Sequence, residues 1–180
     1  MKIIYPIEQL ITLKDEPFPL RFAQEAAKLI AVTDRIACEI TKEGLLLKGI
    51  SEPDLEEAIK KLRENYDEKL ITHEPEIKYI LEPELLEPIM TVSVTTPEEF
   101  MGSVCGDLSQ RRGLIIAMAD HEGKKVITAD VPLVEMLGYS SALRALTYGE
   151  GAFSITFKHY RPAPQGPGPG PRGASGAGVA

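Results

Sequence analysis

The first half of the chain alternates between segments with strand-like and helix-like spacing of apolar residues. Runs rich in β-branched side chains, or with apolar residues at every second position, predict strands, whereas apolar residues at intervals of three and four predict helices. The predicted elements are a strand over 2–13 with an irregularity at Pro6, a helix that opens at 17–19 and ends near 33–34, strands over 35–41 and 45–48, a helix that begins after Ser51, and a strand over 76–80. The order strand–helix–strand–strand–helix–strand describes a ferredoxin-like (βαββαβ) unit.

The second half of the chain repeats that order without detectable sequence identity to the first. Its predicted elements are a strand over 88–95, a helix over 97–111, strands over 114–118 and 125–131, a helical stretch over 132–149 that breaks at Gly138, and a strand over 152–160. We therefore expect an α+β chain of two tandem ferredoxin-like domains with antiparallel sheets, over residues 1–82 and 86–162.

The first helix of the second half has sequence signals at both of its ends. Thr96 is expected to be the N-cap and to form a capping box with Glu99. At the other end, Arg111 and Arg112 lie where the helix dipole favours cations. Gly113 is expected to adopt a positive φ directly after the helix, because glycine tolerates that conformation.

Two glycines, Gly102 and Gly106, lie inside the same predicted helix. Glycine in a helix interior costs about 1 kcal/mol relative to alanine. We therefore expect a neighbouring group to lie so close to the helix that it leaves no room for a side chain at these two positions. Close packing against the sheet and close approach of RNA both meet that requirement, and packing is the expected one. Phe100, Val104 and Leu108 recur every fourth residue and are expected to form the face that packs on the sheet.

The formal net charge of the chain is −7, which argues against general electrostatic adhesion to RNA or DNA. Any RNA contact is therefore expected to be a local cationic patch. Arg111 and Arg112 are the first candidates for that patch, and Lys124 and Lys125 are the second. Capping of the helix C-terminus is the alternative role for the two arginines.

No segment of the sequence predicts membrane insertion or secretion. No apolar run approaches the ~20 residues that span a bilayer, and the first residues lack the zones of a secretory signal. The two isolated cysteines, Cys38 and Cys105, suit a reducing compartment, so a cytoplasmic location is expected. Residues 163–180 consist mainly of Pro, Gly, Ala and Ser, a composition that predicts a disordered tail.

The spacing of reactive residues nominates no catalytic or metal site. His73, His121 and His159 lie in different predicted elements, without paired cysteines nearby. No G-x-x-x-x-G-K-[ST] phosphate loop is present, and no nucleophile can be paired with a base from spacing alone. We expect a protein that is not an enzyme and that needs neither a cofactor nor a metal.

The residue string of the second half is nevertheless specific. Its motifs are Thr96-Pro97-Glu98-Glu99-Phe100-Met101-Gly102, Gly106-Asp107-Leu108, Arg111-Arg112-Gly113, Val131-Pro132-Leu133, Glu135-Met136, Gly138-Tyr139, Leu143-Arg144, Leu146-Thr147, Gly149, Gly151, Phe153 and His159-Tyr160. In order and spacing, over Leu86 to about Pro162, they resemble the fifth domain of translation elongation factor G. The resemblance implies that this half faces the large ribosomal subunit, with Arg111 and Arg112 near phosphates of ribosomal RNA.

The first half resembles the third domain of the same family, through the run Gly49-Ile50-Ser51-Glu52-Pro53-Asp54-Leu55-Glu56. Pro53 and Asp54 replace a Leu-His pair of the family's run, in a domain that couples the family's GTPase to the small ribosomal subunit. The whole domain that separates these two parts in the family has no counterpart here, because residues 79–88 join them directly. No GTPase motif is present either.

These features favour a non-catalytic, translation-related protein that docks at the factor-binding region of the ribosome or pairs with a separate GTPase. The alternative is a ferredoxin-like scaffold, or a regulatory module for a small ligand, that dimerises and does not bind ribosomes. The net charge of −7 and the acidic first half favour this alternative. The ferredoxin-like fold is compatible with either hypothesis, because a fold by itself does not fix a function. Neither hypothesis involves a membrane or DNA.

Overall fold

The computed structural model describes residues 2–164. The chain forms two compact units, Met1–Lys78 and Tyr79–Ala180. Almost all of the tail predicted over 163–180 lies outside the described residues.

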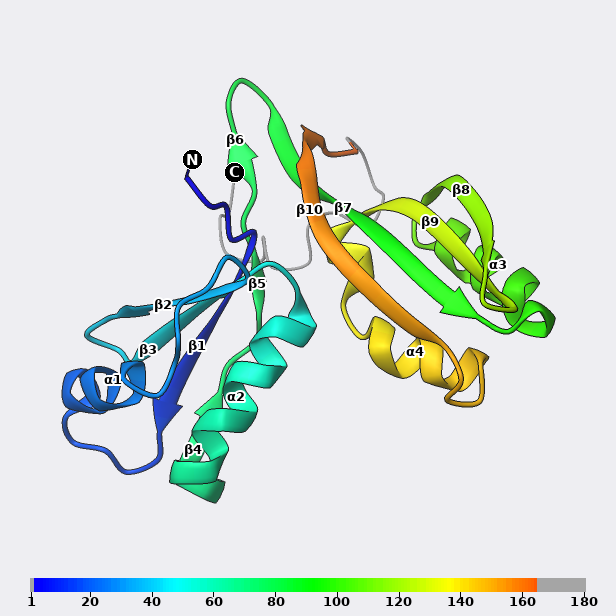
Figure 1. Ribbon diagram of the computed structural model, residues 1–180. Coiled ribbons are helices and arrows are strands. Elements are labelled where there is room, and N and C mark those ends of the chain that lie inside the picture. Colours follow the sequence, from blue (N-terminus) through cyan, green and yellow to red (C-terminus); the bar gives the residue numbers. More distant parts are fainter. Residues whose placement is uncertain (1, 165–180) are drawn as a thin grey trace. The chain divides into compact units, whose positions relative to one another are not determined.

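The first unit is an antiparallel sheet with two helices (Figure 1). Its elements are β1 (Ile7–Leu13), α1 (Pro19–Ala27), β2 (Ile36–Ile40), β3 (Leu45–Gly49), α2 (Glu52–Tyr66), a 3₁₀ turn (Asp67–Lys69), β4 (Leu70–Thr72) and β5 (Glu76–Ile77). The strand order is β2-β3-β1-β4, and β5 also pairs with β1. This is the strand order of a ferredoxin-like fold.

The last strand of the first unit differs from the predicted one. The sequence predicts a strand over 76–80, whereas β1 pairs with two short strands, β4 through Ile11 and Thr72 and β5 through Ile7 and Ile77. Pro75 lies between them and has no N–H to donate to the ladder, which explains the break. Pro6 acts in the same way at the start of β1, so the predicted strand over 2–13 is shortened to Ile7–Leu13. The first helix ends at Ala27, well before the predicted end.

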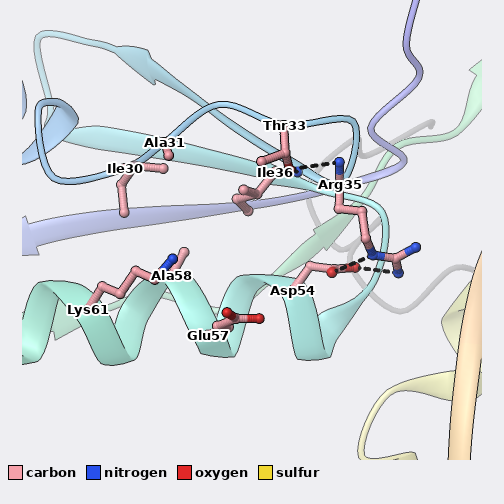
Figure 2. Close-up of a pocket in the computed structure, with 9 residues that line it drawn as sticks. All are labelled: Ile30, Ala31, Thr33, Arg35, Ile36, Asp54, Glu57, Ala58 and Lys61. Carbon is pink, nitrogen blue, oxygen red and sulfur yellow. Dashed lines mark hydrogen bonds and ion pairs between the residues drawn. The ribbon is translucent and has the colours of Figure 1, made fainter.

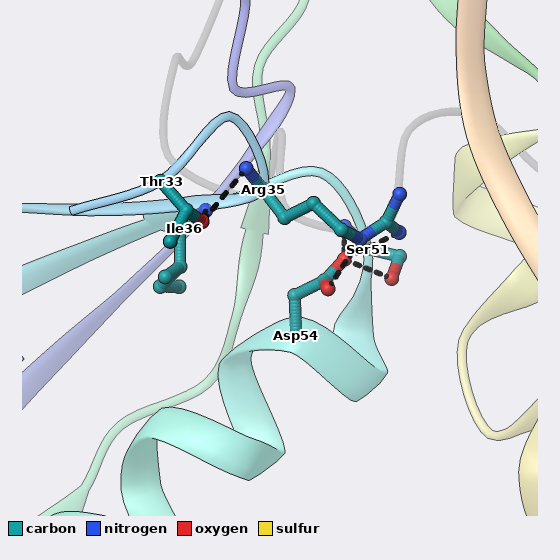
Figure 3. Close-up of polar contacts among 5 residues, drawn as sticks. All are labelled: Thr33, Arg35, Ile36, Ser51 and Asp54. Atoms are coloured by element: carbon teal, nitrogen blue, oxygen red, sulfur yellow. Dashed lines mark hydrogen bonds and ion pairs between the residues drawn. The ribbon is translucent and has the colours of Figure 1, made fainter. Parts of the chain in front are cut away.

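The predicted start of the second helix directly after Ser51 is confirmed, and Ser51 is its N-cap. The Asp54 carboxylate accepts hydrogen bonds from the backbone N–H of Ser51 at 3.1 Å and from its hydroxyl at 2.6 Å. The Arg35 guanidinium donates two hydrogen bonds to the same carboxylate, at 2.8 and 2.9 Å (Figure 3). The cap therefore ties the first turn of α2 to the start of β2 as well as satisfying the helix end.

The second unit has the same topology with longer strands. Its elements are β6 (Ile80–Leu81), β7 (Leu85–Thr96), the 3₁₀ turn η2 (Glu98–Phe100), α3 (Met101–Gln110), β8 (Leu114–His121), β9 (Lys124–Pro132), the 3₁₀ turn η3 (Leu133–Met136), α4 (Tyr139–Leu146) and β10 (Ala152–Pro162). The strand order is β10-β7-β9-β8, all antiparallel, and β6 pairs with the start of β7. The predicted fold class, two tandem ferredoxin-like α+β domains, is confirmed.

The core of the second unit lies between its sheet and α3 and α4. Met90, Val92 and Val94 of β7 are fully buried, as are Val104 and Leu108 of α3. The predicted packing face of the helix is therefore confirmed at two of its three positions, and Phe100 is half-buried. Along β7 the alternate residues Thr91, Ser93 and Thr95 are only partly covered, as expected for a sheet with one open face.

The predicted capping box at the start of α3 is wrong. Thr96 is the buried last residue of β7, and its hydroxyl donates to the Pro97 carbonyl at 3.3 Å. A 3₁₀ turn begins instead, with the Phe100 N–H bonded to the same carbonyl at 3.1 Å, and the α-helix follows only from Met101. The strand thus runs one residue further than the sequence indicates, and Thr96 is used by the sheet.

The C-terminus of α3 is a Schellman motif, but its left-handed residue is Arg112 (φ 58°) and not Gly113. The Gly113 N–H bonds to the Leu108 carbonyl at 2.9 Å, and the Arg112 N–H bonds to the Ser109 carbonyl at 3.2 Å. A Cβ at Gly113 would lie 2.5 Å from the Leu108 oxygen. Glycine is therefore required there by close approach and not by its own φ.

Candidate functional site

The register of the second sheet separates the four predicted cationic residues into two groups. Lys125 pairs with Thr96 at the end of β7, whereas Arg112 contacts Glu87 near the start of β7. At about 3.3 Å per residue, these two points of β7 lie about 30 Å apart. We call the first the loop end (residues 96–100, 121–125 and 147–152) and the second the arginine end (Glu87, Arg111, Arg112, Glu135 and Arg161).

Arg112 at the arginine end is held by two carboxylates. Its guanidinium donates to both oxygens of Glu87 at 2.9 Å and to a carboxylate oxygen of Glu135 at 3.2 Å. The Glu87 side chain is only 3% exposed, and Arg161 approaches it to 3.8 Å from the neighbouring strand. The hydrogen bonds to Glu87 are the main reason why the pKa of Arg112 is raised above its usual value. The bidentate geometry is the strong form of such a pair.

Arg111 is also engaged within the unit. It donates to the Asp107 carboxylate at 2.8 Å and to the Glu135 backbone carbonyl at 2.6 Å. Its guanidinium carbon lies 5.0 Å from the centre of the Tyr139 ring, within the range of a cation–π contact. The two arginines together therefore fasten the end of α3 to β7 and to η3.

The two lysines at the loop end differ from each other. Lys125 forms ion pairs with Asp120 at 2.5 Å and with Glu98 at 3.8 Å. Lys124 is exposed, and its side chain forms no ion pair or hydrogen bond with the residues that the structure describes. Of these two lysines, Lys124 is therefore the one that presents an uncompensated charge.

Sequence reasoning missed Tyr148, an exposed aromatic side chain of the loop end. Tyr148 is 85% exposed and adopts a positive φ of 50°, a conformation that bulky residues rarely take. Its ring stacks at a tilt on Phe100, with centroids 5.6 Å apart. The sequence shows an aromatic residue directly before Gly149, but nothing in that pattern indicates that its side chain is exposed to solvent.

The loop that carries Tyr148 is fixed by Thr147. The buried Thr147 hydroxyl donates to the Leu143 carbonyl at 2.7 Å and accepts from the Gly151 N–H at 2.8 Å. A Cβ at Gly151 would lie 2.8 Å from that hydroxyl oxygen, so the loop closes tightly on it. Arg144, one turn earlier on α4, is exposed and its side chain has no partner within residues 2–164. The loop is thus held by Thr147 while it presents the exposed ring of Tyr148.

The outer face of α3 corrects the expectation for its two glycines. A Cβ at Gly102 or Gly106 would have no atom of the described chain within 4 Å, so neither glycine is required by packing inside the unit. Both are exposed, one turn apart, and Ser103 and Ser109 flank them. Because these two positions have no side chains, another molecule can approach the helix backbone closely on this face.

Around the middle of β7, the open face of the sheet carries no aromatic side chain of the described residues on which bases could stack. Around the middle of β7 it carries hydroxyl side chains, since the residues paired there are small and polar: Thr91, Ser93, Thr95, Thr128, Ser154 and Thr156. Sheets that bind single-stranded RNA use aromatic side chains on this face. An RNA contact by this mode is therefore not favoured.

Within residues 2–164, no group of three or more His, Cys, Asp or Glu side chains is placed to hold a metal ion. None of the helices in that range combines the length and the apolar character that a bilayer crossing needs.

Comparisons with known proteins agree with the motifs of the second half. Residues 84–168 match the family described as elongation factor G C-terminus. A crystal structure of a protein from Thermus thermophilus has a similar fold, with a TM-score of 0.60 and 19% sequence identity. The match covers 91% of this chain and 42% of the Thermus chain, so this chain spans less than half of that protein's length.

Proposed function

We propose that the second unit, whose residues 84–168 match the elongation factor G C-terminus family, is a non-catalytic docking domain for the factor-binding region of the large ribosomal subunit. The family match supports a role in translation. The outer face of α3 is the observation that carries the proposal, because its two glycines serve no contact with the described part of the unit.

Glycine at an exposed helix position costs about 1 kcal/mol, and nothing in the described chain uses the space that Gly102 and Gly106 leave. Glycine also allows a backbone to approach a ligand closely. Phosphate and sugar groups of RNA accept hydrogen bonds from hydroxyl side chains such as those of Ser103 and Ser109. We assign this face of α3 to the contact with ribosomal RNA.

The loop end extends the same surface. Phe100 joins the start of α3 to Tyr148 through their ring contact, and aromatic rings stack on unpaired bases of RNA. Arg144 and Lys124 supply charges that are not already paired within residues 2–164. Lys125 lies at the rim of this surface.

Arg111 and Arg112 take a different part in the proposal. Their guanidinium groups are occupied by Asp107, Glu87 and Glu135, so they support docking by fixing the end of α3. Charge reversal at these two positions would disturb the fold and would not report on RNA contact alone.

Co-sedimentation of the full chain with large ribosomal subunits at low salt tests the proposal. We expect the wild-type chain to co-sediment, Gly106→Ala to weaken binding slightly and Gly106→Gln to weaken it about tenfold or more, because a longer side chain keeps RNA away from the helix. Ser141→Gln, at an exposed position of α4, is the matched control and should bind normally. Failure of the wild-type chain to co-sediment at low salt would overturn the proposal.

The first unit is proposed to correspond to the third domain of elongation factor G. The ferredoxin-like topology and the run Gly49–Glu56 at the β3–α2 junction support this assignment. The resemblance implies that such a domain couples a GTPase to the ribosome, so a separate GTPase is the proposed partner. An affinity measurement between the chain and the GTPase domain of an elongation factor G tests this pairing, and absence of binding with either GDP or GTP bound would contradict it.

One observation favours the alternative, a scaffold that dimerises. β8 is an edge strand, and its Leu114, Ile116 and Met118 are 63%, 47% and 55% exposed. Exposed apolar edges pair with other strands. If the chain elutes as a dimer that Met118→Lys converts to a monomer, and ribosomes are not bound, the alternative replaces the docking proposal.

A further inference from the structure

The first unit contains a pocket of about 220 Å³ between α2 and the segment that leads from α1 into β2. Figure 2 shows the α2 side chains on one side of the pocket and the 30–36 segment on the other. The pocket is lined by Ile30, Ala31, Thr33, Arg35, Ile36, Asp54, Glu57, Ala58 and Lys61. It lies in the unit that the docking proposal does not use for RNA contact.

The interior of the pocket is aliphatic. Ile30 is 6% exposed and Ala58 is 4% exposed, and Ile36 is half-buried beside them. No aromatic side chain lines the pocket among the described residues. Such a surface takes a short aliphatic group in preference to a planar ring.

One wall of the pocket is held rigid by polar contacts (Figures 2 and 3). The Thr33 hydroxyl accepts hydrogen bonds from the backbone N–H groups of Arg35 and Ile36, at 3.0 and 3.2 Å. The Arg35 guanidinium pairs with the Asp54 carboxylate, which Ser51 also holds. The pocket is therefore formed before any ligand arrives, which lowers the cost of binding.

The charges of the pocket add to zero. Arg35 and Asp54 compensate each other, and the remaining two are Glu57 and Lys61, on consecutive turns of α2. Both are exposed, and neither side chain forms an ion pair or hydrogen bond with a residue that the structure describes. A phosphate or another multiply charged anion would meet as much negative as positive charge here.

We propose that this pocket binds a short aliphatic α-amino acid. Glu57 receives the ligand ammonium group, Lys61 receives its carboxylate, and Ile30, Ile36 and Ala58 cover its side chain. The volume lies below the roughly 300–1,000 Å³ of pockets that bind drug-sized molecules, and so suits a ligand of this size.

The proposal is tested by titrating the isotope-labelled full chain with leucine, valine and alanine, and following the backbone amide signals of residues 30–36 and 54–61. We expect leucine and valine to shift these signals. Isovalerate, which is valine without its ammonium group, and isopentylamine, which is leucine without its carboxylate, should each bind about tenfold more weakly or worse than the parent amino acid, since each loses a charge-assisted contact. Inorganic phosphate should cause no shift in this segment.

Lys61→Gln is expected to weaken leucine binding about tenfold, and Lys60→Gln, its exposed neighbour outside the pocket, is the matched control. Ala58→Leu fills the pocket and should abolish binding; if it unfolds, the Lys61→Gln result decides. Absence of any shift with all three amino acids, or equal binding of leucine, isovalerate and isopentylamine, overturns the proposal. Either result leaves the ribosome measurement unaffected, because that measurement concerns the second unit.

Discussion

The arginine end and the loop end of the second unit both carry cationic side chains. They differ in whether those side chains are paired with carboxylates of the same unit or exposed to solvent. At the arginine end, Arg112 meets the buried carboxylate of Glu87 and its charge is used to hold the unit together. At the loop end Lys124 and Tyr148 are exposed, as is Arg144 near the end of α4. Adjacent arginines in a sequence therefore do not identify a binding surface until their partners are known.

The largest expected effect comes from breaking the pair at the arginine end. Glu87→Gln leaves Arg112 without its main carboxylate, and removing one partner of a buried pair costs about 3 kcal/mol. Hydrogen exchange of the buried amides of β7 and β9 measures the loss. Glu84→Gln, an exposed position nearby, is the control and should change stability by less than about 0.5 kcal/mol. Equal stability of the two variants would show that the Glu87–Arg112 pair contributes nothing.

Gly102 inside α3 and Gly113 directly after it differ in how much space surrounds them. Gly113→Ala places a Cβ 2.5 Å from the Leu108 oxygen, and the resulting strain is expected to destabilise the second unit by about 1–3 kcal/mol. Gly102→Ala meets open space and should stabilise the helix by up to about 1 kcal/mol. The same hydrogen-exchange measurement compares them, and effects of the same sign would contradict the structure.

Tyr148 is expected to contribute to docking and very little to stability. Tyr148→Gly relieves a positive φ that costs about 1–2 kcal/mol and loses a ring contact with Phe100 worth about 1 kcal/mol. These terms offset each other, so thermal denaturation should show a net change below about 1 kcal/mol. Ribosome binding should fall about tenfold, as for loss of a stacked base. Normal binding by a stable Tyr148→Gly variant would remove the loop end from the docking surface.

The smallest effect is expected for the free lysine of the loop end. Lys124→Gln should leave stability within about 0.5 kcal/mol of the wild-type value. It should also reduce the slope of log binding constant against log salt concentration by about 0.7–0.9, the value for one phosphate contact. Lys125→Gln is the comparison, since Lys125 is already paired with Asp120. A larger change in slope for Lys125 than for Lys124 would reverse the assignment.

The two units also show where sequence patterns fail. The order of elements was predictable because apolar spacing follows the local geometry of helices and strands. The break between β4 and β5 has a local cause, Pro75, that is visible in the sequence. The extension of β7 to Thr96 was not predictable, because it depends on the pairing of Thr96 with Lys125 across the sheet. The cap of α2 was predictable, since Ser51 and Asp54 are three residues apart and need no distant partner.

The sequence alone therefore determined the two ferredoxin-like units, the motifs of the second half and the residue types available for docking. Only the tertiary structure decided which of those residues face outward. Arg112 finds its carboxylates 25 and 23 residues away, and a pattern of local spacing carries no information about such partners. The proposed docking surface and the proposed ligand pocket both rest on charged side chains that the fold leaves without a partner among the described residues, Lys124 and Arg144 in the second unit and Glu57 and Lys61 in the first.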